Sequence, residues 1–214
     1  MKIAVVTEVS TKHRNSDVME ALSEFDHTIY NVGMTGDKDG FELSYIHTSF
    51  MTAILLDINA VDFVVGGCGT GQGYAIATNM YPNIFCGLLY DPLEAWLFPQ
   101  INEGKAVSIP LNKQYGWAGE YNLRFIFRAL FSAPAGGGYP PERYEPQKLF
   151  RNKLKELSVA THRDSLCEIM ENLDTSIFIE CAKNKLFLDL ILKTETNSPS
   201  KELFLKLINR NHVD

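Results

Sequence analysis

The segment that most constrains the fold of this chain is residues 61–80. An apolar, β-branched and aromatic run at 62–65 is typical of a buried strand, and it leads directly into residues 66–73, of which five are glycine. Residues 75–77 then restore a helix-compatible pattern. This order of strand, glycine turn and helix places backbone N–H groups at the carboxyl end of a strand, where they stabilise negative charge. Cys68 lies at the mouth of the turn.

Two interpretations of Cys68 are open. The turn could cradle a phosphate or a nucleotide with Cys68 as a small buried filler, since free cysteines are often inert packing. Alternatively the thiol is reactive, because thiolates are stabilised at helix N-termini. Neither common nucleotide template fits the turn. It lacks the Lys-Ser/Thr ending of a P-loop, and the glycine spacing in 69–73 is too short for the dinucleotide fingerprint.

Strand-like and helix-like patterns alternate through residues 1–131. We predict five strands at 2–7, 27–32, 62–65, 84–90 and 106–110, separated by helical segments such as 16–25, about 41–59, and 93–101, and followed by an amphipathic helix at 117–131. This alternation predicts an α/β fold with a doubly wound, five-stranded parallel sheet, flavodoxin-like or Rossmann-like, in three layers. Ligands are then expected at the carboxyl ends of the strands, where the loops after Thr7, Val65 and Tyr90 converge.

Composition narrows the class of protein and its partners. The 214 residues are 45% apolar and 21% charged, which is typical of a soluble globular chain. A net charge of −6 and a pI near 5.4 argue against nucleic acid or an anionic membrane as partner, but allow a phosphorylated small molecule. The four cysteines have neither metal-site nor disulfide spacing, and no signal peptide or membrane-spanning run is present. We therefore expect a reduced, cytoplasmic protein without a metal.

The C-terminal third differs in pattern from the rest. Residues 132–146 are rich in glycine and proline, and helical patterns follow at about 147–162, 164–172, 175–194 and 199–210. We predict an α/β domain at 1–146 and a helical extension at 147–214. Nothing in the extension has catalytic spacing, so we expect it to serve packing or contacts between subunits.

The central segment resembles one enzyme family, the type B ribose-5-phosphate isomerases and their galactose-6-phosphate isomerase relatives. The resemblance covers roughly residues 1–150, and its signature is matched without a gap by Cys68-Gly69-Thr70-Gly71-x-Gly73, Ile76-Ala77-x-Asn79, Pro82 and Ile84. The resemblance implies a cofactor-independent aldose–ketose isomerase that acts on a small sugar phosphate, a pentose, tetrose or hexose phosphate. It also implies a homodimer or larger homo-oligomer, because the family's sites are shared between two chains.

The same resemblance assigns roles around Cys68. Cys68 would be the base that moves a proton through an enediolate, and the oxyanion pocket would be formed by Thr70 and the N–H groups of Gly69, Gly71 and Gly73. Asn102 lies where the family has a His-Asn pair and could hold a substrate hydroxyl. The family places a phosphate-binding arginine near residue 140, which makes Arg143 the candidate here. A linker is an equally good interpretation of that segment.

The sequence departs from the family pattern at two positions. The first loop reads Glu8-Val9 instead of Asp-His, and Ile101 stands where relatives have the histidine that opens the sugar ring. Glu8 or His13 could replace the lost acid, or the substrate could arrive as an open chain such as a tetrose 4-phosphate. Glu8 and Ser10 are candidate substrate-binding residues of the new loop, and Lys12 is its candidate phosphate ligand, although a solvated basic turn is equally plausible. Asp91 follows Tyr90 in the position of a family pair, but we interpret it as a helix cap.

Two other functions are compatible with these residues. The missing histidine would suit a protein of the same fold that binds a sugar phosphate with reduced turnover. The fold would also suit a flavodoxin-like nucleotide-binding or flavin-binding module, since unrelated functions share it.

Overall fold

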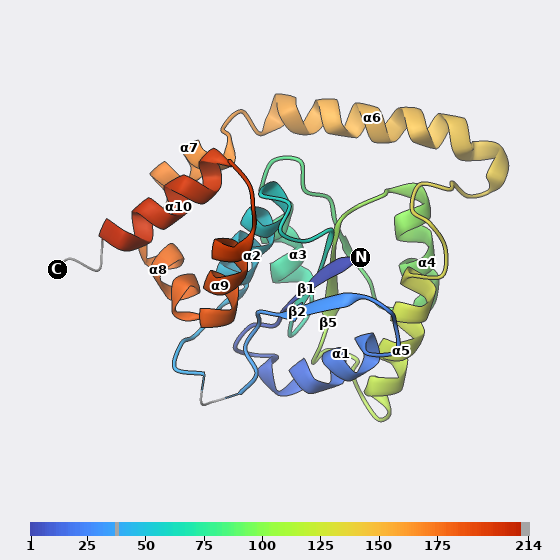
Figure 1. Cartoon of the computed structure of the whole chain (residues 1–214). Helices are drawn as coiled ribbons and strands as arrows, with labels where there is room; N and C mark the ends of the chain where they lie inside the picture. Colours follow the sequence, from blue (N-terminus) through green and yellow to red (C-terminus); the bar gives the residue numbers. More distant parts are fainter. Residues whose placement is uncertain (37–38, 211–214) are drawn as a thin grey trace.

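The computed structural model describes residues 1–36 and 39–210, and it contains one parallel sheet. The strands are β1 (Lys2–Val6), β2 (Thr28–Asn31), β3 (Phe63–Cys68), β4 (Cys86–Leu88) and β5 (Ala106–Pro110), in the spatial order β2-β1-β3-β5-β4 (Figure 1). All four pairings are parallel, and helices cover both faces, which confirms the predicted three-layer α/β fold. A flavodoxin-like order would place the fifth strand at the edge. Here β5 lies between β3 and β4, so the loop after β5 is the neighbour of the Cys68 turn.

Three helices cover one face of the sheet: α1 (Asn15–Leu22), α4 (Pro92–Ile101) and α5 (Gly119–Leu130). The apolar stripes of these helices pack against alternate side chains of β1, β3 and β5. The stripes include Val18, Leu22, Leu123 and Phe127. Asp91 caps α4 by accepting a hydrogen bond from the Glu94 N–H at 2.9 Å, with proline at the first helical position. The capping role predicted for Asp91 is confirmed.

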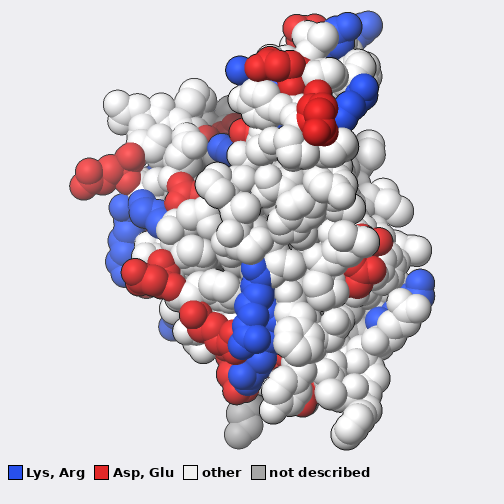
Figure 2. All heavy atoms as spheres, turned by 90° about the vertical axis from the view of Figure 1, so that its right-hand side faces the viewer, with Lys and Arg blue, Asp and Glu red and all other residues white. Residues whose placement is uncertain are grey.

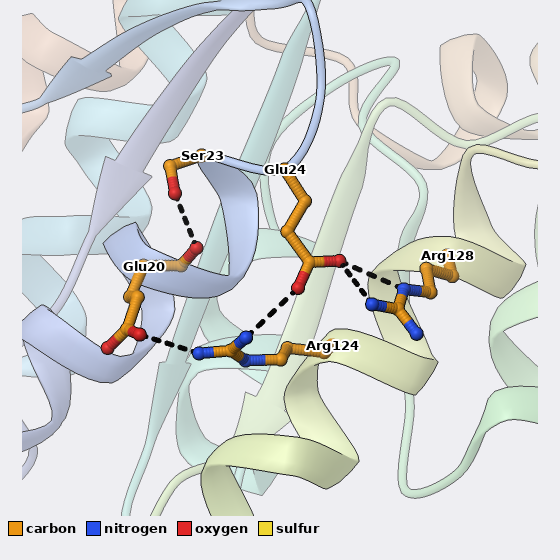
Figure 3. Close-up of polar contacts among 5 residues, drawn as sticks. All are labelled: Glu20, Ser23, Glu24, Arg124 and Arg128. Atoms are coloured by element: carbon orange, nitrogen blue, oxygen red, sulfur yellow. Dashed lines mark hydrogen bonds and ion pairs between the residues drawn. The ribbon is translucent and has the colours of Figure 1, made fainter.

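A network of ion pairs holds α5 against α1 at the surface (Figure 3). Arg124 contacts Glu20 at 2.6 Å and Glu24 at 3.2 Å, and Arg128 contacts Glu24 at 2.8 Å. Because Glu24, two residues beyond the end of α1, accepts from both arginines, α5 is joined to α1 and the turn after it by a connected set of charges and not by isolated pairs.

The other face is covered by α2 (Tyr45–Asp57) and α3 (Gln72–Thr78). The α2 helix begins at Tyr45, four residues later than the expected start near residue 41, because Ser44 caps it. The Ser44 hydroxyl accepts from the Ile46 N–H at 3.3 Å, while Nδ1 of His47 accepts from the Ser44 N–H at 2.9 Å. Residues 48–55 are all buried, so α2 is covered on its outer side as well as by the sheet.

The outer side of α2 is covered by the helical extension. Two short 3₁₀ turns, Lys12–Arg14 and Pro141–Arg143, occur earlier, and the extension contains α6 (Tyr144–Thr161), α7 (Leu166–Asn172), α8 (Ser176–Lys183), α9 (Lys185–Lys193) and α10 (Pro199–Arg210). The single helix expected at 175–194 is wrong. Asn184 divides it, because its side chain accepts from the N–H groups of Leu186 and Phe187 and donates to Val32 O at 2.7 Å. The first turn of α6 also lies before the predicted boundary at residue 147.

The extension and α2 share one hydrophobic core. Phe50 of α2 contacts Phe178 of α8 and Phe204 of α10, with ring centroids 4.7 and 5.8 Å apart, and all three side chains are fully buried. Each aromatic ring buries roughly 150–250 Å² on folding. In Figure 1 the four helices α7 to α10 accordingly lie beside α2 and not apart from it.

The α6 helix is different from its neighbours in the extension. It has 18 residues, about 27 Å at ~1.5 Å per residue, and only Arg151 and Ser158 are buried. Arg151 contacts Glu103 at 2.9 Å and the carbonyl of Gly136 at 3.1 Å. Four apolar side chains are more than half exposed on this helix: Leu149, Phe150, Leu157 and Val159. Polar groups thus anchor α6 to the body along the upper edge of Figure 1, while much of its apolar surface faces outward. None of the described helices is long and apolar enough to cross a membrane.

Candidate active site

Cys68 is the last residue of β3, and its side chain is 7% exposed. Its Sγ lies 3.9 Å from Oγ1 of Thr70, on the exposed side of the turn. Gly71 gives the turn its shape because its φ of +75° is disfavoured for other residues. A Cβ on Gly71 would also lie 2.6 Å from the Leu88 side chain. The turn therefore presents a thiol and a hydroxyl together at the carboxyl edge of the sheet.

The segment after β5 holds this turn in place. The carbonyl of Gly69 accepts from the N–H groups of Asn112 and Lys113 at 3.1 and 2.8 Å, and the Ser108 hydroxyl donates to Gly71 O at 2.5 Å. The N–H of Gly71 donates within the turn to Cys68 O at 3.1 Å, so it is occupied in this state. The N–H groups of Gly69 and Gly73 were also predicted for the oxyanion pocket. Neither group is a donor in the hydrogen bonds named here.

The first loop brings Glu8 and Ser10 to the Cys68 turn. The Glu8 side chain is buried, and its carboxylate accepts from both the N–H of Ser10, at 3.0 Å, and the Ser10 hydroxyl. The Ser10 Oγ lies 3.4 Å from the position that a Cβ on Gly69 would occupy. Asn112 Nδ2 donates to Ser10 O at 2.9 Å and so connects the two loops. Both predicted residues therefore lie beside the Cys68 turn.

The basic residues of the first loop have different environments. Lys12 is half-buried and His13 is exposed, both in the 3₁₀ turn that follows Ser10. Arg14 is engaged elsewhere, with its guanidinium 4.0 Å from the centre of the Tyr115 ring and 3.5 Å from Asp17. Lys12 and His13 are the residues of this loop that the sequence proposed for substrate contacts.

Asn102 and Arg143 lie at the opposite edge of the sheet. Asn102 ends α4, a helix of ten residues, or about 15 Å, that starts at the carboxyl edge beside β4. The glycine-rich loop is anchored to that far end, with Gly136 N donating to Pro99 O at 2.8 Å and Gly138 N to Gln100 O at 3.0 Å. Arg143 follows this loop and is exposed. Within one chain, the structure does not bring either residue together with Cys68.

A cavity of about 1160 Å³ lies at this opposite edge, beneath α6. Its walls include Phe63, Ile84, Phe131 and Val159, but no residue of the Cys68 turn. The large cavity and the thiol are thus on different sides of the molecule, and we place the candidate site at Cys68 because the reactive groups converge there.

Three residues of the site were not found from the sequence. Asn112 and Lys113 reach the turn from β5, and the Lys113 ammonium lies 5.2 Å from the centre of the Tyr90 ring. Tyr45, at the start of α2, packs its ring 3.3 Å from the position that a Cβ on Gly73 would occupy. The one available signal was that Asn112 and Lys113 follow a predicted strand. This position indicates a contact with the Cys68 turn only once β5 is known to lie beside β3.

Two of the other thiols, Cys86 and Cys181, have environments that suppress reactivity. Burial raises the pKa of Cys86 and of Cys181, which keeps both protonated near neutral pH. All four cysteines are free.

Comparison with known proteins identifies the family. The profile described as Ribose/Galactose Isomerase matches residues 3–117, more than half of the chain. The chain belongs to this family. It is accordingly a sugar isomerase, and the resemblance of the Cys68 turn to type B ribose-5-phosphate isomerases is confirmed. A search of curated protein sequences found no match.

Solved structures of this isomerase family extend the likeness to the whole chain. A 4-deoxy-L-threo-5-hexosulose-uronate ketol-isomerase, complexed with a tartrate, is 34% identical with a TM-score of 0.92, covering 98% of this chain and 100% of that one. A ribose-5-phosphate isomerase from Vibrio parahaemolyticus is 36% identical with a TM-score of 0.90, covering 97% and 99%. Coverage of this extent includes the helical extension.

A shorter structure shows the shared fold alone. The ribose 5-phosphate isomerase from Thermotoga maritima is 22% identical with a TM-score of 0.57, covering 72% of this chain and 97% of that one.

Proposed function

We propose that this sugar isomerase interconverts an aldose and a ketose through an enediolate, with Cys68 as the base. The observation that carries the proposal is the position of Cys68, buried at the carboxyl end of β3 with its Sγ 3.9 Å from the Thr70 hydroxyl. Cys86 and Cys181, whose thiols burial keeps protonated, are unsuited to this role. Membership of a sugar isomerase family limits the reaction type.

The reaction requires two proton movements and no net redox change. The Cys68 thiolate takes the proton from C2 of the aldose, the electrons form the enediolate, and the thiol returns that proton to C1. An unperturbed thiol is only a few per cent thiolate at about pH 7, so the site must favour the anion. The developing oxyanion would receive hydrogen bonds from the Thr70 hydroxyl and from the N–H groups of Gly69 and Gly73, and such donors commonly contribute ~10²- to 10³-fold to kcat.

The second proton moves between the two sugar oxygens. Glu8 and Ser10 are suited to this transfer because a buried carboxylate and a hydroxyl are hydrogen-bonded beside Gly69. His13 is the alternative acid for opening a ring, since the family's histidine position holds Ile101. An isoleucine cannot transfer a proton.

The substrate would carry one anionic group. Lys113 and Lys12 are the cations next to the Cys68 turn, and Arg143 could reach it only from a second copy of the chain. A sugar phosphate, of four to six carbons in our proposal, would place its negative charge beside these cations. The ketol-isomerase relative is named for a uronate, which carries a carboxylate in place of a phosphate. Both kinds of anion therefore belong in the substrate panel.

A homodimer would complete this site. Figure 2 shows the side of the molecule that carries α4 and α5, where a broad uncharged area is bordered by acidic and basic groups. The exposed apolar side chains of these helices include Leu93, Tyr121 and Phe125, and Trp117 just before α5 is 100% exposed. Stable interfaces bury about 800 Å² per partner. Pairing through this side would bring Asn102 and Arg143 of one copy toward the Cys68 of the other.

Replacement of Cys68 tests the proposal. The wild type would be assayed by NMR for aldose–ketose conversion of ribose 5-phosphate, erythrose 4-phosphate, galactose 6-phosphate and 4-deoxy-L-threo-5-hexosulose uronate. Cys68→Ser and Cys68→Ala are expected to lose about 10²- to 10⁴-fold in kcat on the sugar that the wild type converts. The matched control Cys167→Ser, in the extension, is expected to keep full activity. A Cys68 variant that keeps more than about a tenth of the wild-type kcat would contradict the assignment.

The relative rates on these sugars test the consequence of Ile101. A tetrose 4-phosphate cannot close a furanose ring because its O4 carries the phosphate, so it needs no ring-opening acid. We expect a higher kcat/KM for erythrose 4-phosphate than for ribose 5-phosphate. If His13→Ala selectively loses activity on ribose 5-phosphate, the acid has moved to the first loop instead. A wild type that binds these sugars without converting any of them would indicate a binding protein.

A further inference from the structure

The first turn of α2 borders the proposed active site. Tyr45 is its first residue, and its ring packs over Gly73, five residues beyond Cys68. The Tyr45 side chain is 43% exposed, and its hydroxyl is engaged by none of the other residues that the structure describes. A half-exposed tyrosine at this position presents its hydroxyl at the rim of the Cys68 turn.

The segment before Tyr45 is held from two sides. On one side, Val9 of the first loop donates its N–H to Leu43 O at 2.8 Å. On the other, Glu180 of α8 accepts the N–H of Glu42 at 2.7 Å, although the two residues are 138 positions apart in the chain. The thiol of Cys181 also donates to the carbonyl of His47, at 3.6 Å. The helical extension thus contacts the backbone on both sides of Tyr45.

These contacts are separate from the packing that stabilises the extension. The core between the extension and α2 is aromatic and fully buried at Phe50, Phe178 and Phe204. Glu180 lies at the edge of this core, where its carboxylate pairs with Lys183 and with the Glu42 backbone. Because a surface carboxylate adds little to a core of this size, its main effect falls on the position of residues 42–45.

We propose that α8 of the extension positions the substrate-binding tyrosine of this isomerase. Glu180 fixes the backbone that leads into α2, and this holds the Tyr45 ring over Gly73, where the Tyr45 hydroxyl hydrogen-bonds a hydroxyl of the sugar. Tyr45 is then a specificity residue, and Glu180 is a positioning residue that acts through it. The proposal deepens the proposed function, because it takes the Cys68 turn as the place where the sugar binds.

The physical consequence is a selective effect on binding. A hydrogen bond to an uncharged hydroxyl is worth about tenfold in affinity at most. An interaction made equally in the ground state and the transition state changes KM and leaves kcat alone. Loss of Tyr45 or of its positioning group is therefore expected to raise KM with little change in kcat.

A double-mutant cycle tests the proposal in the full-length protein. Tyr45→Phe is expected to raise KM about 3- to 10-fold, Glu180→Ala to raise it by a similar factor, and both to keep kcat within about twofold. Glu180→Gln retains an acceptor for the Glu42 N–H, so we expect it to restore most of the wild-type KM. The double variant is expected to be no worse than Tyr45→Phe alone, because both changes remove the same contact. Glu171→Gln, an exposed carboxylate of α7, is the matched control.

The cycle distinguishes a Glu180 that positions Tyr45 from one that only stabilises the fold. Additive effects in the double variant, or a Glu180→Ala variant with unchanged KM, would overturn the proposal. A merely structural Glu180 would lower the melting temperature and kcat together, and that result would also count against it.

The readout does not depend on Cys68 being the base, since KM can be measured in any variant that converts sugar. If none of the panel is converted, dissociation constants from calorimetry replace KM and the same order of variants is expected. Absence of sugar binding would refute the assignment of Tyr45.

Discussion

The two faces of the sheet are covered by different numbers of helical layers. The face behind α2 is covered twice, first by α2 and α3 and then by the extension, and its aromatic side chains Phe50, Phe178 and Phe204 are fully buried. The face behind α4 and α5 is covered once. It leaves Tyr121 and Phe125 exposed one turn apart on α5, and Trp117 exposed just before that helix. The four helices α7 to α10 thus form an internal interface with α2, whereas the exposed aromatic rings lie on the side that we propose for contact with a second copy.

This difference explains why the extension and the subunit contact are separate questions. From its sequence, the extension is expected to serve packing or contacts between subunits. The helices α7 to α10 pack on the chain's own α2, whereas α4, α5 and α6 carry exposed apolar side chains such as Leu93, Phe125 and Phe150. The interface proposed for a second copy therefore lies on the face that the extension does not cover.

The largest effect is expected from the covered face. Phe178→Ala leaves a cavity between α8 and α2, and we expect it to lower the free energy of unfolding by about 3–5 kcal/mol. Phe125→Ala lies on the outer surface of α4 and α5, which we call the bare face. We expect it to lower the free energy of unfolding by less than ~0.5 kcal/mol in a monomeric sample. Urea denaturation followed by circular dichroism measures both. Equal costs for the two variants would remove the distinction between the faces.

A smaller effect is expected on the assembly of the bare face. Phe125→Asp places a charge in the proposed interface, and we expect the dimer dissociation constant to rise about tenfold or more. Sedimentation velocity at micromolar concentration measures this shift. Leu192→Asp, an exposed position on α9, is the matched control and is expected to leave assembly unchanged. A wild type that sediments as a 24.1 kDa monomer would show that this face is not an interface under those conditions.

The ion pairs between α1 and α5 are expected to contribute less again. Arg124→Met keeps much of the apolar stem but removes the contacts with Glu20 and Glu24, at a cost of about 1 kcal/mol or less. The cost is expected to shrink in ~1 M salt, where exposed charges are screened. Urea denaturation at two salt concentrations checks this. Arg163→Met, an exposed arginine of the α6–α7 turn, is expected to show no salt-dependent difference from the wild type.

The last expected effect is a pH dependence at the start of α2. Burial lowers the pKa of His47 from 6.5, although Glu180 and Glu42 raise it in part. The unfolded chain therefore takes up the proton first, so stability is full above pH 6.5 and is lost as pH falls through the lowered native pKa.

The free energy of unfolding is expected to fall between about pH 7 and 5, with a slope that corresponds to the uptake of at most about one proton on unfolding. His47→Gln keeps an acceptor for the capping box but does not titrate, and the carboxylates of Glu42 and Glu180 remain. We expect the pH dependence in this range to diminish in that variant. An unchanged slope would assign the dependence to other groups.

Local pattern was enough to predict much of this molecule. The five strands, the Cys68 turn and the Asp91 cap are properties of short segments, and each was found from residues adjacent in the chain. The neighbours of the turn were not. Asn112 and Lys113 contact Gly69 because β5 lies beside β3, and strand order depends on packing across the whole sheet.

Long-range contacts limit the prediction of the extension in the same way. Asn184 ends α8 because its amide reaches Val32 O, a partner 152 positions away that no local pattern reveals. Arg143 was assigned by its place near residue 140, but its distance from Cys68 depends on the direction of α4 and on how many copies assemble.

The contacts that cover α2 join residues far apart in the sequence, and this affects how the chain folds during synthesis. Phe50 meets Phe178 and Phe204 only after more than a hundred further residues have been translated. At about 5–20 residues per second, the outer side of α2 stays uncovered on the ribosome for roughly six to thirty seconds. During that interval the nascent α/β layers expose an apolar helix face. Among the helices that the structure describes, α10 is synthesised last, and its Phe204 completes the aromatic cluster over that face.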